Sequence, residues 1–161
     1  MSTNRRAPLP GSSRHQRPNI GILLRDLHHD LVQRVTIELA DAGFADIRPA
    51  HTAVFQHIDA DGSRLTDLAD RAHITKQSMG YLVDYLEARG YVERRPDSND
   101  RRVALICLTE HGWDQVRAAL AIITEIEDEW TRQLGKSRMS QLRDAATELR
   151  STSIRDDRRQ R

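Results

Sequence analysis

The sequence lacks most signatures of secreted, membrane and disulfide-stabilised proteins. Its single cysteine excludes an internal disulfide framework and a four-cysteine zinc site. No stretch approaches the roughly 18 consecutive apolar residues that a membrane-spanning helix needs, so no membrane partner is expected. Residues 1–19 have no apolar run, which argues against a secretory signal and favours a cytoplasmic protein. Only 4% of the 161 residues are aromatic and 30% are charged, which favours helices with one solvated face around a modest core.

The sequence also lacks the motifs of common catalytic sites. It has no phosphate-cradling glycine loop, no Gly-x-Ser-x-Gly and no His-Glu-x-x-His, so an enzyme is not expected. No two histidines stand four residues apart, which disfavours a regulatory zinc site, and we expect no cofactor. Cys107 lies in an apolar run and is predicted to be buried, unreactive packing.

Positive charge is concentrated at the two ends of the chain. Residues 1–19 contain four arginines and no acidic residue, and residues 150–161 contain five arginines. Acidic residues outnumber basic ones in the segment between them. A protein with this distribution is not a uniform cationic coat for nucleic acid, and it would need a localised basic patch to bind DNA.

Apolar residues at helical spacing predict six helices separated by polar or glycine-containing breaks. The predicted helices cover 20–42, about 50–59, a segment that begins at Thr66 as N-terminal cap and ends near Ala72, a segment capped by Thr75 that runs to about Arg89, a long helix capped by Thr109 that ends at Gly135, and a last helix that carries Met139, Leu142, Ala146 and Leu149. The segment Tyr91–Arg95 and the apolar run 103–108, which has β-branched residues, predict two strands of a hairpin whose polar turn is formed by 96–100.

The short turn at 72–74 predicts a helix-turn-helix, because it lets the second helix cross the first steeply and present its N-terminal half to a DNA major groove. Met79, Leu82, Val83 and Leu86 share the face that is expected to pack inward. The opposite face near the start of this helix carries Thr75, Lys76, Gln77, Ser78, Gly80 and Tyr81. Gln77 suits adenine edges, Lys76 suits phosphate or guanine, and Ser78 suits either base or phosphate.

Four arginines flank the tip of the predicted hairpin. They are Arg94, Arg95, Arg101 and Arg102. A narrow minor groove attracts guanidinium groups, and Asp100 is placed to orient one of the neighbouring arginines through a carboxylate contact. A charge run of this kind usually marks a solvated turn, but its place directly after a helix-turn-helix favours a wing that binds DNA.

The stretch LVDYLEARGYVERRPDSNDRRVALICLTEHG resembles the MarR family of bacterial transcription regulators. It contains the family's Leu-Glu-x-x-Gly-x-Val-x-Arg at Leu86–Arg94, its Asp-Arg-Arg at Asp100–Arg102 and its Leu-Thr-x-x-Gly at Leu108–Gly112. The order of helices agrees over about 20–150. The resemblance implies a mostly α (α+β) fold: a winged helix-turn-helix with a two-stranded wing and a helical dimerisation lobe.

The resemblance also assigns roles to residues of the predicted DNA-binding face. Asp100 and Arg102 correspond to the wing residues that grip DNA, and Gln77, Ser78 and Tyr81 fall on base-reading positions. Many relatives have an arginine or another polar group where Tyr81 stands, so the resemblance does not carry an operator preference over to this chain.

The long apolar stripes of the first and the last two helices predict a homodimer, because a small winged domain cannot cover them. We expect a disordered basic arm over 1–19, a dimerisation region over 20–45 and 109–150, a winged domain over 46–108 and a charged tail over 151–161.

The expected function is a DNA-binding repressor of a pseudo-palindromic operator. The alternatives left open are a winged-helix interaction module and a metal-responsive regulator without a phenolic ligand.

A small-molecule effector is the remaining expectation. The resemblance implies an effector pocket between the two lobes, lined by the first, second and fifth helices, and phenolic carboxylates are a common effector class in relatives. His28, His51 and Trp113 are the candidate pocket residues. The competing interpretation is that the two histidines are ordinary interface or surface residues. The family's redox-sensing branch carries a cysteine near the start of the first long helix, which this chain lacks.

Overall fold

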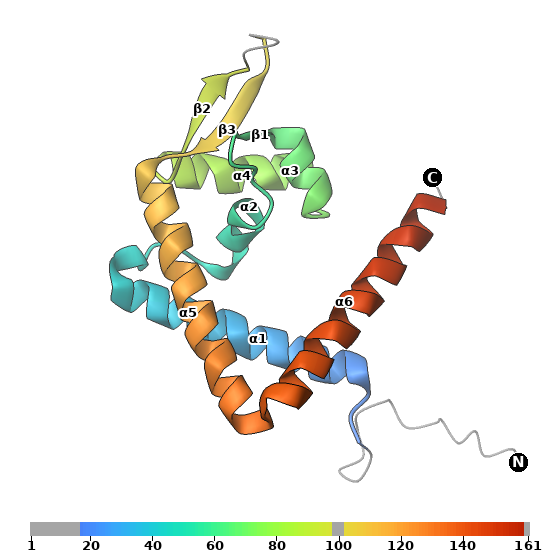
Figure 1. The fold of residues 1–161 in the computed structure, drawn as a ribbon. Coiled ribbons are helices and arrows are strands. Elements are labelled where there is room, and N and C mark those ends of the chain that lie inside the picture. Colours follow the sequence, from blue (N-terminus) through green and yellow to red (C-terminus); the bar gives the residue numbers. More distant parts are fainter. Residues whose placement is uncertain (1–16, 98–101, 160–161) are drawn as a thin grey trace, which may run out of the picture.

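A computed structural model describes residues 17–97 and 102–159, with the burial of side chains up to residue 151. The chain folds into helices and a small sheet (Figure 1). The elements are α1 (Ile20–Leu39), a π-helical turn (Ala40–Phe44), a 3-10 turn (Pro49–His51), α2 (Thr52–Phe55), β1 (Ser63–Arg64), α3 (Leu65–Arg71), α4 (Lys76–Glu87), β2 (Val92–Pro96), β3 (Ala104–Leu108), α5 (Glu110–Leu134) and α6 (Lys136–Arg159).

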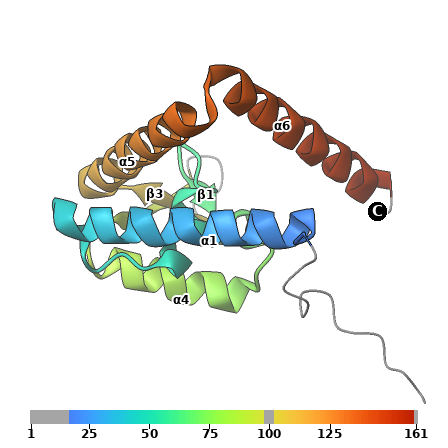
Figure 2. The ribbon, with the colours of Figure 1, turned by 90° about the horizontal axis from the view of Figure 1, so that it is seen from below.

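The elements form two lobes joined by one long helix. In Figure 1 the sheet, α3 and α4 lie at one end, whereas α1 crosses the other end, where α5 and α6 meet. The view from below shows α5 and α6 diverging from their shared turn above α1 (Figure 2). No helix in the described part of the chain carries the apolar stretch that crossing a membrane requires. Helix α6 continues to Arg159, so most of the predicted C-terminal tail is helical.

Side-chain caps fix the beginnings of the long helices. Asn19 accepts a hydrogen bond from the backbone N–H of Ile22 at 3.0 Å. The predicted caps at Thr75 and Thr109 are confirmed, since their hydroxyls accept from the backbone N–H groups three residues on. The predicted cap at Thr66 is wrong: α3 begins at Leu65, directly after β1.

In the described part of the chain the sheet has three antiparallel strands in the order β1-β3-β2, which adds a strand to the predicted hairpin. The hairpin is confirmed, with Val92 opposite Leu108 and Arg94 opposite Ile106. Strand β1 pairs Ser63 with Ile106 on the other edge of β3. Sequence analysis missed β1 because a strand of two residues is too short to show an alternating pattern. Its pairing with β3 also places the start of α3 before Thr66. The second helix is likewise shorter than predicted, since α2 ends at Phe55.

The turn between α3 and α4 is closed by a Schellman motif, the hydrogen-bond pattern that commonly ends helices. His73 adopts a positive φ of 54°, its N–H donates to the carbonyl of Asp70, and the N–H of Ile74 donates to the carbonyl of Ala69. Glycine usually occupies this left-handed position. The predicted helix-turn-helix at 72–74 is therefore confirmed, and its tight turn sets the crossing of α3 and α4.

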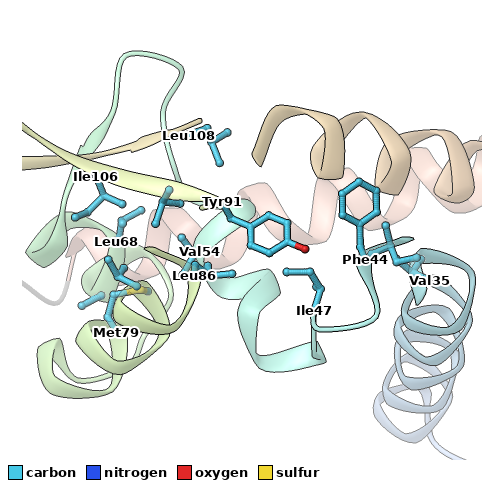
Figure 3. Close-up of a cluster of buried hydrophobic side chains, with 14 of the residues drawn as sticks. Val35, Phe44, Ile47, Val54, Leu68, Met79, Leu86, Tyr91, Ile106 and Leu108 are labelled. Carbon is cyan, nitrogen blue, oxygen red and sulfur yellow. The ribbon is translucent and has the colours of Figure 1, made fainter. Parts of the chain in front are cut away.

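One continuous core runs through both lobes, and Tyr91 lies at its centre. Figure 3 shows the Tyr91 ring between Leu86 on the winged side and Phe44 and Ile47 on the side of α1. The Tyr91 side chain is buried, and its ring stacks on His111 of α5 at 4.3 Å. The two lobes are thus not separately packed domains, because Tyr91 contributes to both.

Two helical glycines predict opposite effects of an added methyl group. A Cβ on Gly112 would lie 2.1 Å from the backbone carbonyl of Tyr91, whereas a Cβ on Gly80 would lie 4.0 Å from Leu65. We expect Gly112→Ala to lower the free energy of unfolding by about 3 kcal/mol through overpacking. Gly80→Ala should raise it by up to about 1 kcal/mol through helix propensity. Urea denaturation of both variants checks this, and equal shifts would contradict the close approach at Gly112.

Candidate nucleic-acid interface

Helix α4 has one buried face and one polar face, as the sequence predicts. Met79, Val83 and Leu86 are completely buried, and Leu82 is half-buried against the core. Thr75, Lys76, Gln77, Ser78 and Tyr81 are all exposed. The Cβ position of Gly80 faces Leu65 of α3, so this glycine lies beside the polar face rather than on it. Helix α4 therefore presents a compact set of polar side chains at its N-terminal end.

Hydrogen bonds order the side chains of this polar face. Thr75 caps the helix, and its hydroxyl also lies 2.8 Å from that of Ser78. Gln77 donates from Nε2 to the Tyr81 hydroxyl at 3.2 Å, one helical turn further on. Lys76 is the first residue of the helix and is exposed. The face thus combines one cation with two pairs of hydrogen-bonding side chains.

Arg94 of the wing (the β2–β3 hairpin) is held by carboxylates of its own chain. Its Nη2 lies 2.5 Å from Oδ1 of Asp84 on α4, and its Nη1 contacts Glu87 on the same helix. Sequence analysis placed Arg94 at DNA, whereas the structure shows it joining the wing to α4. A phosphate contact by Arg94 would have to compete with two carboxylates.

The other predicted wing residues are only partly described. Arg95 is exposed and pairs with Glu93 on the same strand. Arg102 is exposed just before β3. Asp100 and Arg101 lie outside the described residues.

An ion pair that sequence analysis missed lies at the turn end of the wing, directly after β2. The buried Asp97 accepts from Arg64 of β1 at 3.0 Å, and its backbone N–H donates to the carbonyl of Val103. The ion pair thus joins β1 to the end of β2. No local pattern connects Arg64 with Asp97, because they are brought together only by the pairing of β1 with β3.

A largely apolar cavity of about 280 Å³ lies between α1, α2 and α5. Its lining includes Val35, Phe55, Val116 and Ile123, with polar groups from His28, Arg48 and Gln115. Of the three predicted pocket residues, only His28 lines it. Trp113 lies instead beside an open depression with Glu93 and Cys107. Cys107 is buried, and burial raises the pKa of its thiol.

His51 has a structural environment. It is buried, its ring stacks on Tyr85 of α4 at 4.3 Å, and its Nδ1 accepts the backbone N–H of Arg48 at 3.1 Å. Burial, together with the charges of Arg48 and Arg89, lowers the pKa of His51 below its usual value. A neutral His51 therefore holds the 3-10 turn against α4 instead of facing the cavity.

Gln115 is the cavity residue that sequence analysis missed. It is 2% exposed, and its Oε1 is buried without a hydrogen-bond partner among the described residues. An unsatisfied buried amide oxygen is costly, and each such group in a native structure calls for a partner. A glutamine on the polar half of a helix pattern gives no signal of this kind in the sequence.

These features define a winged helix-turn-helix protein with a small, mostly apolar cavity between α1, α2 and α5. Among the described residues, no group of three His, Cys, Asp or Glu side chains is placed to hold a metal ion. Residues 45–103 match the model of the MarR family, and a similar solved structure from Rhodococcus sp. RHA1, 26% identical with a TM-score of 0.65, is a transcriptional regulator of that family. Members of this family are regulators rather than enzymes.

The similarity extends beyond the matched segment. The uncharacterized HTH-type transcriptional regulator YdcH of Bacillus subtilis (strain 168) is 28% identical over 109 residues, which cover 66% of this chain and 74% of that protein. CouR from Rhodococcus jostii RHA1, solved with p-coumaroyl-CoA, is 26% identical with a TM-score of 0.65, covering 81% of this chain and 91% of CouR. The Staphylococcus aureus MepR–DNA complex has a TM-score of 0.67 at 24% identity, covers 84% and 99% of the two chains, and shows the shared fold.

Proposed function

We propose that the chain is a cytoplasmic, homodimeric repressor that reads a pseudo-palindromic operator and releases it when a small aromatic effector binds. The observation that carries DNA reading is the polar N-terminal face of α4, exposed beside the wing. Side chains at this end of a recognition helix reach base edges when the helix enters the major groove. Thr75, Lys76, Gln77, Ser78 and Tyr81 would contact the major groove, with Arg95, Asp100, Arg101 and Arg102 at the minor groove.

Arg94 has a different part in this proposal. Because it joins β2 to Asp84 and Glu87 of α4, it keeps the wing at a set distance from the helix that enters the groove. Two DNA-contacting elements that are held in one geometry lose less conformational entropy when they bind. Arg94 is thus a positioning residue for the wing rather than a phosphate contact.

The two lysines of the chain offer a matched test of DNA binding. Lys76 begins α4 and Lys136 begins α6, in different lobes of the protein. We expect the wild type to enrich a duplex from a random pool, and Lys76→Ala to weaken binding to all duplexes. The slope of log affinity against log salt should fall by about one for each phosphate that the variant no longer neutralises.

Lys136→Ala is the control and should change neither affinity nor slope. Enrichment of no duplex by the wild type would remove the repressor proposal and favour a winged-helix interaction module. An unchanged slope in Lys76→Ala would remove Lys76 from the interface.

The proposal of a homodimer rests on apolar side chains that the described part of the chain leaves exposed. Leu23, Leu24 and Leu27 form a stripe on the first half of α1, and each is more than 40% exposed. Leu142 and Leu149 are exposed on α6, which projects away from α5 (Figure 2). A second copy placed across these two helices would cover both stripes and pair the two α4 helices.

A charge in the α1 stripe should separate the subunits. Leu27 is 47% exposed, so Leu27→Asp should leave the fold of the subunit intact and raise the dimer dissociation constant at least about ten-fold. Gln33→Asp places the same charge on another exposed position of α1 and should leave the dimer unchanged. Sedimentation velocity at micromolar concentration measures both, and a monomeric wild type would contradict the proposed homodimer.

The effector part of the proposal rests on the cavity. Its volume of about 280 Å³ lies just below the range for small-molecule sites, about 300–1,000 Å³, so it suits only a small effector. Its walls are mostly apolar, and the Gln115 Oε1 needs a hydrogen-bond donor. The ligand in the similar CouR structure contains a phenol, and a phenolic hydroxyl is such a donor.

The cavity and α4 share one short segment of chain. Ile47, Arg48 and Thr52 line the cavity, while Asp46 and His51 of the same segment contact Tyr85 of α4. A ligand that displaces this segment would therefore move the reading helix. It can shift DNA affinity only by its different affinity for the two positions of that helix.

Replacing the unpaired amide separates stability from effector response. Gln115→Met keeps the side-chain length but removes the unsatisfied oxygen, so the free energy of unfolding should rise by about 1 kcal/mol. The same variant should lose release of DNA by 4-hydroxybenzoate, the probe, in a fluorescence anisotropy titration. Gln133→Met, at an exposed position of α5, should change neither property. A full response in Gln115→Met would contradict the role of this amide, and a wild type insensitive to the probe would contradict this effector class.

A further inference from the structure

Tyr81 is an exposed aromatic residue that does not pack against the core of the described part of the chain. Its side chain is 66% exposed, and it is not among the residues that pack against the core. Within the described part of the chain, its hydroxyl accepts a hydrogen bond from Nε2 of Gln77, at 3.2 Å. An aromatic ring that is left in solvent on a binding face is available for a partner.

The bond to Tyr81 defines what Gln77 can still offer. A glutamine amide has two N–H donors and one carbonyl acceptor. With one N–H directed to Tyr81, one N–H and Oε1 remain. One donor and one acceptor, side by side, match N7 and the N6 amino group of adenine in the major groove.

The Tyr81 ring supplies a second kind of contact. It lies one helical turn beyond Gln77 on the same face, and apolar groups at such positions contact the C5-methyl of thymine. The neighbouring Ser78 is less available, because its hydroxyl is shared with Thr75 and its backbone N–H is used in the helix cap. Base discrimination thus concentrates on Gln77 and Tyr81.

We propose that Gln77 and Tyr81 act as one coupled unit that reads A·T base pairs in each operator half-site: the Gln77 amide pairs with adenine while the Tyr81 hydroxyl holds that amide and the Tyr81 ring contacts thymine. This specificity assignment rests on the proposed function of the chain as a DNA-binding regulator. The coupling follows from the hydrogen bond, which restricts the long Gln77 side chain before DNA arrives and so reduces the entropy lost on binding.

A double-mutant cycle on the selected operator tests the coupling. The wild type first selects a duplex from a random pool, and each A·T pair of a half-site is then replaced by G·C. At one position or two neighbouring ones, we expect the wild type to prefer A·T about ten-fold. Gln77→Ala should abolish most of that preference, and Tyr81→Phe, which keeps the ring, should reduce it several-fold at the adenine that Gln77 reads. The double variant should keep at least the A·T preference that Gln77→Ala keeps, because the Tyr81 hydroxyl acts only through the Gln77 amide.

Tyr85→Phe provides the matched control. Tyr85 lies on the same helix, but its hydroxyl donates to the carbonyl of Asp46, away from the polar face. This variant loses one contact that holds α4 and should bind more weakly to all duplexes, but its ratio of affinities for A·T and G·C pairs should stay that of the wild type. Two results would overturn the coupled unit while leaving the DNA-binding proposal in place. One is that Tyr81→Phe keeps the wild-type preference for A·T at every position. The other is that the losses of A·T preference in the two single variants multiply in the double variant. A wild type that selects no duplex would overturn both.

Discussion

The arrangement of the two lobes depends on Asp46, which lies between α1 and α2. Its carboxylate accepts a hydrogen bond from the Tyr91 phenol at 2.6 Å and lies 3.4 Å from Arg89 at the end of α4. Its backbone carbonyl accepts from the Tyr85 hydroxyl at 2.9 Å. Burial and the Asp46 carboxylate raise the pKa of Tyr91, so this phenol stays a donor. One residue thus joins α1, α4 and the start of the wing.

The position of the reading face follows from this junction. Helix α4 is held at its C-terminal end by Asp46 and at its side by Arg94 of the wing, so its N-terminal end is the part left to meet a partner. The cation–π contact of Arg89 with Tyr85, at 3.4 Å, adds to the hold at the same end. The exposed side chains from Lys76 to Tyr81 owe their availability to these attachments elsewhere on the helix.

Features set by neighbouring residues could be predicted from the sequence, and features set by distant ones could not. The caps at Thr75 and Thr109, the hairpin and the turn at 72–74 depend on residues within a few positions, and all were confirmed. The wrong cap at Thr66 follows from a strand pairing with residues 105 and 106. The family resemblance supplied the fold, but not Asp46, Gln115 or the carboxylates that hold Arg94, because these roles depend on packing between elements far apart in the chain.

In the proposed regulator, the length of α5 decides how a small cavity can influence DNA binding. Its 25 residues span about 37 Å at the rise of an α-helix, from the end of β3 to the turn before α6. Its cavity-lining part, Gln115 to Ile123, is centred closer to the wing than to the far end of the helix. Thr109 attaches this helix to the wing through its hydroxyl on the carbonyl of Gly90, so tilting α5 about its far end moves the wing farther than the cavity wall. A small ligand that tilts α5 at the cavity would therefore cause a larger displacement of the wing. The position of the wing matters because it sets the spacing between the DNA contacts of the two subunits.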